Sequence, residues 1–157
     1  MAKLQPPFLL FIPPPILYAA FFGAGLALDR LVRWHPAWME SAPARGLAWL
    51  SVAAAVGFGL GSLCLFWFRS TTVIPHGQPA RLITGGPFAV SRNPIYLALT
   101  VGYCGAAVLA VRAWPLVFLA GPLIVMQLVV IPFEERRMQA AFGQAYADYC
   151  RQVRRWL

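Results

Sequence analysis

The feature that most constrains this chain is a set of four apolar runs, each close in length to a bilayer-crossing helix. The runs cover residues 8–28, 46–68, 94–111 and 113–133. A helix crosses the hydrocarbon core with about 20 residues, and it satisfies its own backbone hydrogen bonds there. Only 11% of the 157 residues are charged, whereas a soluble domain has roughly 25%. We therefore expect an all-α, polytopic membrane helical bundle with about four transmembrane helices, forming a single membrane domain over residues 1–157.

The first run contains three consecutive prolines, residues 13–15. Proline lacks a backbone N–H and clashes with the preceding turn, so we expect a kinked or broken helix there. A cleavable signal peptide is the alternative, because Lys3 precedes the run and "YAA" is a small-residue cleavage pattern. The apolar run continues beyond that pattern to Leu28, which favours a retained span.

The third and fourth runs are separated only by Arg112 and the "AWP" turn. So short a connection predicts a tight helical hairpin, with Pro94 in the first turn of its first helix, where a missing N–H costs nothing. The start of the third span and the end of the fourth then lie side by side at one membrane surface.

Basic residues are distributed unequally between the two sides of this four-span arrangement. One side has nine, Lys3, Arg69, Arg81, Arg92, Arg136, Arg137, Arg151, Arg154 and Arg155, and the other has four, Arg30, Arg33, Arg45 and Arg112. The positive-inside rule then places both termini in the cytoplasm, and we expect an integral protein of the bacterial inner membrane. The net charge of +8 indicates contact with membrane lipids and no nucleic-acid partner.

Two polar segments lie on the cytoplasmic side. The loop at 69–93 is rich in Pro, Gly, Ser and Thr, and we expect it to fold back on the membrane face. The tail at 134–157 has an aromatic and apolar stripe at steps of four and three residues, formed by Phe142, Tyr146, Tyr149, Val153 and Trp156. This spacing predicts one interfacial amphipathic helix over the tail.

No metal site is expected. The three cysteines, Cys64, Cys104 and Cys150, form no C-x-x-C pair, and the predicted topology places His35 and His76 on opposite sides of the membrane. Neither zinc nor a disulfide is suggested by this pattern.

The hairpin brings Arg92, Asn93 and Tyr96 near Glu134 and Glu135 at the cytoplasmic rim of an apolar bundle. Two interpretations follow. The cluster is a ligand site, or the arginines determine topology and contact lipid phosphates while Glu134 pairs with a neighbouring arginine of the tail.

The chain resembles a known pair of families over roughly residues 69–157. The stretch "LITGGPFAVSRNPIYLAL", followed by "PFEERRMQAAFGQAYADYCRQVRRW", is similar to the C-terminal half of isoprenylcysteine carboxyl methyltransferases and phospholipid methyltransferases. The matching positions are Gly86, Pro87, Phe88, Arg92, Asn93, Pro94, Tyr96, Glu134, Glu135, Phe142, Gly143, Tyr146 and Tyr149.

The resemblance implies an integral membrane enzyme that transfers a methyl group from S-adenosylmethionine at the cytosolic face. The catalytic residues it implies are Arg92, Tyr96 and Glu134. The cofactor-binding residues it implies are Arg81, Leu82, Ile83, Phe88, Arg92, Asn93, Pro94, Tyr96, Glu134 and Glu135. In this interpretation Glu134 takes the cofactor's amine or ribose diol, Arg92 pairs with its carboxylate, and Phe88 frames the adenine.

The resemblance also implies a lipophilic acceptor that enters through an apolar tunnel. Two positions depart from the prenylcysteine enzymes. Asn93 replaces a histidine, and Val129 and Val130 occupy the stretch where those enzymes have an arginine for the acceptor carboxylate. We therefore expect another lipophilic small molecule or lipid, such as a lipid amine, a phenol or a thiol.

Two further classes stay open on resemblance alone. Sterol-reductase-like membrane proteins share part of this C-terminal architecture and use a nicotinamide cofactor. A non-catalytic membrane protein on the same scaffold is the other alternative.

Overall fold

The computed structural model describes residues 8–68 and 82–157, and the regular structure within them is helical. In chain order the elements are η1 (Phe8–Phe11), α1 (Pro14–Leu31), η2 (Ala37–Glu40), α2 (Ala42–Phe68), η3 (Gly86–Ala89), α3 (Pro94–Leu109), α4 (Trp114–Phe118), α5 (Ala120–Val125), the π-helical η4 (Met126–Val130), α6 (Ile131–Phe142) and α7 (Gln144–Gln152). The all-α prediction is confirmed.

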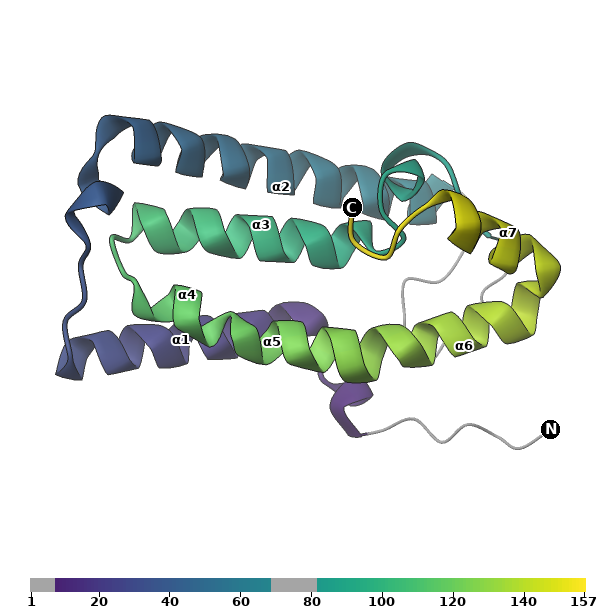
Figure 1. Cartoon of the computed structure of the whole chain (residues 1–157), viewed down its shortest axis with the longest axis horizontal. Helices are drawn as coiled ribbons and strands as arrows, with labels where there is room; N and C mark the ends of the chain where they lie inside the picture. Colours follow the sequence, from purple (N-terminus) through teal and green to yellow (C-terminus); the bar gives the residue numbers. More distant parts are fainter. Residues whose placement is uncertain (1–7, 69–81) are drawn as a thin grey trace.

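Helices α1, α2 and α3, and then the run from α4 to α6, lie along the long axis of the molecule, each antiparallel to the one before it (Figure 1). We call the run from α4 to α6 the fourth pass. Helix α3 packs along α2, and α1 packs along α4 and α5. The turn between α3 and α4 is only residues 110–113, as the sequence predicted, and Val111 adopts a positive φ of 53° within it. The hairpin prediction is therefore confirmed.

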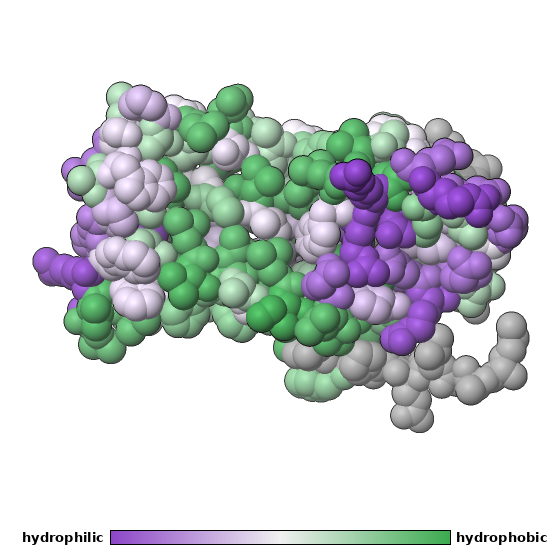
Figure 2. Space-filling view, viewed as in Figure 1, coloured by the Kyte–Doolittle hydropathy of each residue, from purple (hydrophilic) through white to green (hydrophobic). Residues whose placement is uncertain are grey.

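Two helices in the described part of the chain are long and apolar enough to cross a membrane, Ala42–Leu65 and Trp114–Phe142. Helix α3 is apolar but shorter, with 16 residues. The surface is apolar along much of the molecule, and hydrophilic residues gather at the end formed by α6 and α7 (Figure 2). These features indicate an integral membrane protein, while the four-span count remains a prediction.

The prolines of the first apolar run break it into two helical pieces, as expected. The short η1 ends at Phe11, and α1 begins at Pro14 with prolines in its first turn. Because the first N–H groups of a helix have no intrahelical acceptor, proline is well tolerated there.

The boundary predicted at residue 133 and the single tail helix over 134–157 are both wrong. The helical run of the fourth pass continues beyond residue 133 and ends at Phe142. Gly143 then adopts a φ of +51°, a conformation that glycine reaches without strain, and α7 starts after it. From Val153, which is extended, the chain leaves the helix. As a result, Glu134 and Glu135 belong to the long fourth pass.

A π-helical turn interrupts that fourth pass just before Pro132. The Ile131 N–H donates to the carbonyl of Met126, five residues back. Pro132 has no N–H, and its ring would clash with the carbonyl four residues earlier in a regular helix. The π-helical turn contains one extra residue, which relieves this clash and rotates the side chains that follow it by about 100° around the helix axis. Glu134 follows this turn, so the direction of its side chain includes this rotation.

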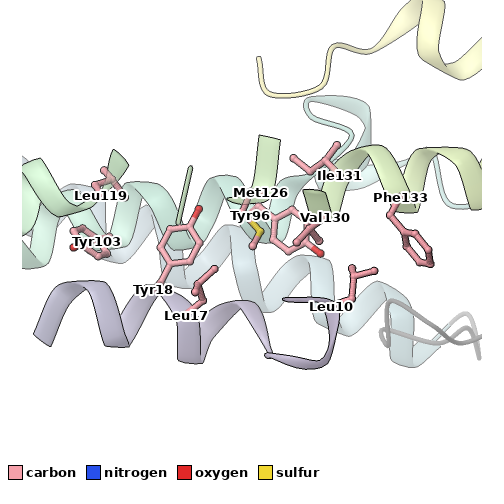
Figure 3. Packing of buried hydrophobic residues seen from close by; sticks show 10 residues of the cluster. All are labelled: Leu10, Leu17, Tyr18, Tyr96, Tyr103, Leu119, Met126, Val130, Ile131 and Phe133. Carbon is pink, nitrogen blue, oxygen red and sulfur yellow. The ribbon is translucent and has the colours of Figure 1, made fainter. Parts of the chain in front are cut away.

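A core of aromatic and aliphatic side chains joins α1, α3 and the fourth pass (Figure 3). Tyr18 and Tyr103 stack edge to face with ring centroids 6.1 Å apart. The Tyr18 hydroxyl also shares a hydrogen bond of 2.9 Å with the Thr100 hydroxyl. This core fixes α1 against α3.

An ion pair around a buried carboxylate joins α1 to the α3–α4 turn, at the end of the bundle opposite α7 (Figure 1). Asp29 is only 3% exposed, and its Oδ2 accepts from Arg112 Nη1 at 2.7 Å and from His35 Nε2 at 2.9 Å. The Ala113 N–H donates to the Trp34 carbonyl at 3.1 Å. Arg112 thus has a packing role that its place in the charge asymmetry did not predict.

Gly25 gives a test of the α1–α4 contact. A Cβ at this position would lie 2.7 Å from the Cα and N of Pro115, and these backbone atoms cannot swing away. We expect Gly25→Ala to lower the free energy of unfolding by about 1–3 kcal/mol. The matched control is Gly23→Ala, because a Cβ there meets nothing within 4 Å. Thermal unfolding in detergent measures the difference, and equal midpoints for the two variants would contradict this packing.

Candidate functional site

A cavity of about 1310 Å³ lies among α1, α2 and α3 and reaches α6. Most of its wall is apolar, with Phe22 from α1, Leu60 from α2 and Ala98 from α3. The side chains of Arg92, Asn93, Glu134 and Arg137 make its wall polar at one end. The cavity therefore joins a charged rim to an apolar groove between helices.

Tyr96 and Glu134 form the contact between α3 and α6 at this rim. The Tyr96 hydroxyl donates to Glu134 Oε1 at 2.7 Å, and Tyr96 is 9% exposed. Both residues line the cavity. The predicted proximity of these two residues is confirmed, and it arises because the hairpin places the start of α3 beside the end of the fourth pass.

Glu135 points to a different set of partners. Arg92 Nη2 lies 3.2 Å from Glu135 Oε1. Arg155 donates to the same carboxylate through both ends of its fork, Nε to Oε1 at 3.1 Å and Nη2 to Oε2 at 2.6 Å. This hydrogen bond to Glu135 raises the pKa of Arg155 above its ordinary value. The two adjacent glutamates are thus separated, one toward Tyr96 and the other toward two arginines.

A second, smaller cavity of about 390 Å³ lies beside Glu135. Several of the residues that line it have polar side chains, among them Arg92, Gln139 and Tyr146. Arg92 lines both cavities. Arg92 therefore stands between the apolar groove and the smaller cavity beside Glu135.

Arg92 has hydrogen-bonding capacity that the described residues do not use. Its Nε is buried and has no hydrogen-bond partner within them. Its Nη1 contacts the Cys150 sulfur, a weak acceptor. A buried guanidinium donor without an acceptor is costly, and a planar carboxylate is the ligand that its fork geometry fits best.

Asn93 and Pro94 hold the start of α3. The Asn93 Nδ2 donates to the Arg155 carbonyl at 2.9 Å, and Pro94 is fully buried in the first helical turn. An amide makes this bond at any pH, whereas a histidine would change its hydrogen bonding on titration. Asn93 thus also anchors the C-terminal residues, a role that sequence reasoning did not anticipate.

The residues predicted to frame an adenine are only partly brought together. Phe88 is buried, lines the large cavity, and accepts a hydrogen bond of 2.6 Å at its carbonyl from the Tyr149 hydroxyl. Burial raises the pKa of Tyr149 to about 12. Leu82 and Ile83 are half-buried and line neither of these two cavities. Arg81 lies outside the described residues.

Two carboxylates and two arginines thus lie at or beside the rim of a largely apolar cavity, in a helical bundle that includes helices of membrane-spanning length. The sequence model of the phospholipid methyltransferase family matches residues 49–145, more than half of the chain. The chain therefore belongs to the phospholipid methyltransferase family. No curated protein and no solved structure matches it.

The family match extends the resemblance seen in the sequence. It includes most of α2, all of α3 and the fourth pass with its two glutamates. Membership supports methyl transfer in a membrane over the two alternative classes, because the matched segment contains Arg92, Glu134 and Glu135 and much of the cavity wall.

Proposed function

We propose that this protein is an S-adenosylmethionine-dependent methyltransferase that acts on a lipophilic acceptor at the cytosolic face of the membrane. The observation that supports it best is the single cavity in which Arg92, Asn93 and Glu134 meet a long apolar groove. A soluble cofactor can then reach the polar end of this cavity from the cytosol, and an acceptor dissolved in the membrane can reach it along the apolar groove.

The residues at the rim fit this cofactor. The unpartnered donor of Arg92 suits a carboxylate, and the Glu134 carboxylate suits an amine, a diol or a nearby positive charge. S-adenosylmethionine supplies a methyl group on a sulfonium, and its transfer to an acceptor lone pair breaks the carbon–sulfur bond and leaves a neutral thioether. In this proposal Arg92 and Glu134 fix the position of the cofactor, Tyr96 aims the methyl group, and the apolar wall excludes water.

The apolar part of the cavity supports a lipophilic acceptor. Helices α1 and α2 form its two sides, and their outer faces expose apolar side chains such as Ile16 and Leu50. An acceptor dissolved in the bilayer enters between these helices. Val130 is an uncharged residue packed in the core, where it is 2% exposed. This position therefore offers no cation to an acceptor carboxylate, which favours a substrate other than a prenylcysteine.

Topology is a separate prediction of this proposal. Helix α7 lies at one end of the molecule, and the connection between α1 and α2, which includes η2, lies at the other (Figure 1). With four spans and a cytosolic site, reporter fusions after Leu157 and near Ala37 are expected to report opposite sides of the membrane, with the C-terminus cytoplasmic. Fusions that report the same side would contradict the four-span count.

Cofactor titration tests the proposed class. Purified full-length protein in detergent is titrated with S-adenosylmethionine and, separately, with a reduced nicotinamide dinucleotide. We expect saturable heat only with S-adenosylmethionine. Binding of the nicotinamide cofactor alone would point to the oxidoreductase, and binding of neither would support a non-catalytic protein.

A further inference from the structure

The last residues of the chain fold back against the start of α3. We call residues 153–157 the C-terminal strap. The Arg92 N–H donates to the Arg154 carbonyl at 3.0 Å, and the Asn93 Nδ2 donates to the Arg155 carbonyl at 2.9 Å. These bonds involve the backbone of the strap, so they fix its path and leave the arginine side chains available for other contacts.

The strap delivers one of those side chains to α6. Arg155 makes two hydrogen bonds to the Glu135 carboxylate, one to each oxygen. The next residue, Trp156, donates its indole N–H to Gln127 Oε1 at 2.9 Å in the π-helical turn. Anchors on both sides of Arg155 hold its guanidinium in a fixed orientation, the arrangement in which a forked ion pair is strongest.

The contact with Arg155 determines how much of Arg92 is available to a ligand. Arg92 also lies against Glu135, at 3.2 Å, yet its Nε has no acceptor among the described residues. Two guanidinium groups share one carboxylate, so the cluster of Arg92, Glu135 and Arg155 carries a net positive charge beside the smaller cavity. Without Arg155, the cation nearest to Glu135 would be Arg92, and the Glu135 carboxylate would neutralise the charge of Arg92.

We infer that Arg155 is a positioning residue that engages Glu135 and thereby keeps Arg92 available for the carboxylate of the cofactor. This inference rests on the proposed function. It gives the C-terminal strap a role in cofactor affinity. It also assigns Glu135 a different role from the one that the sequence suggested, because Glu135 competes with the cofactor for Arg92 and does not bind the cofactor directly.

Binding of two ligands by full-length Arg155→Gln protein tests this inference. S-adenosylhomocysteine has the amino-acid end, whereas 5′-methylthioadenosine has the same adenosine without it. We expect Arg155→Gln to weaken binding of the first by about tenfold, the scale of one charge-assisted contact, and to leave the second unchanged. The matched control is Arg154→Gln, because Arg154 is exposed and contacts Arg92 through its carbonyl.

A second substitution separates positioning from a merely structural role. If Glu135 captures Arg92 once Arg155 is gone, removing the Glu135 charge should release it. The double variant Glu135→Gln/Arg155→Gln is therefore expected to recover the affinity of the unmodified protein for S-adenosylhomocysteine. Loss of packing alone would make the double variant as weak as Arg155→Gln, or weaker.

The outcomes are distinct. Unchanged binding in Arg155→Gln, an equal loss for both ligands, or no recovery in the double variant would each overturn the inference alone. No binding of S-adenosylhomocysteine or S-adenosylmethionine by the unmodified protein would overturn the proposed function with it. If Arg155→Gln lowers the thermal midpoint, Arg155→Lys repeats the test with the charge retained, and its affinity must lie between those of the unmodified protein and Arg155→Gln.

Discussion

Glu134→Gln is expected to weaken S-adenosylmethionine binding by about 1–3 kcal/mol, roughly 5- to 150-fold, while the protein stays folded. Glutamine keeps an oxygen that can accept the 2.7 Å hydrogen bond from Tyr96 but removes the negative charge that faces the cavity. The cofactor carries an ammonium and a sulfonium, and both lose an attractive partner. Isothermal calorimetry on purified protein measures the change.

Two companion variants separate charge from structure. Glu134→Ala also leaves the buried Tyr96 hydroxyl without this acceptor, so it should cost about 1–3 kcal/mol of folding stability in addition. Glu40→Gln is the matched control, because Glu40 is exposed in η2 and lines neither cavity. If Glu134→Gln binds the cofactor normally, Glu134 is not part of the cofactor site and serves only to hold Tyr96.

Gly23→Trp is expected to shorten the acceptor that the enzyme can use. Gly23 lines the cavity from α1, and a side chain there has free space around its Cβ. Each buried methylene contributes about 0.8 kcal/mol, so excluding about four of them would lower kcat/KM for a long acceptor by up to roughly 200-fold. Assays with acceptors of graded chain length measure the effect.

The control for this variant is Gly23→Ala, which adds one methyl group in the same place. The residues proposed to hold the cofactor, Arg92, Asn93 and Glu134, lie just before α3 and on α6 and not on α1, so S-adenosylmethionine affinity should change little. A parallel loss of cofactor binding and of activity toward short acceptors would show that the indole disturbs the bundle, and it would contradict an acceptor path along this groove.

Length and proline placement made much of the fold predictable. Pro14 and Pro94 begin helices because a first-turn proline loses no hydrogen bond, and this preference is visible in the sequence. The Tyr96–Glu134 contact was also accessible, since a very short turn leaves two antiparallel helices little freedom of register. The short turn therefore made this contact predictable, although its two residues are 38 positions apart and no local sequence pattern links them.

The tail was mispredicted because side-chain periodicity does not detect a change of backbone conformation. The aromatic stripe passes through Phe142 and Tyr146 at helical spacing, yet Gly143 between them adopts a positive φ. A glycine after an apolar helical residue is the local signal that was available. Whether such a glycine ends a helix depends on where the following residues pack. Here the Tyr149 hydroxyl donates to the Phe88 carbonyl, so α7 packs against the segment before α3.

Contacts between distant segments were the least predictable part of the site. Arg155 was counted only as a topology determinant, and its pairing with Glu135 requires the strap to leave α7 and return to α3. Asp29 and Arg112 are separated by 83 positions and come together only because α1 packs beside the turn before α4. Such pairs follow from the assembled bundle and have no local sequence pattern.

Methyl transfer in proteoliposomes tests the central claim most directly. Unmodified protein and Glu134→Gln are reconstituted with a total membrane lipid extract and supplied with S-adenosylmethionine labelled in its methyl group. We predict label in the organic phase with the unmodified protein, and much less with Glu134→Gln at a subsaturating cofactor concentration. Label confined to water-soluble products, or equal labelling of lipid by the two proteins, would contradict a cytosolic-face methyltransferase that takes its acceptor from the bilayer.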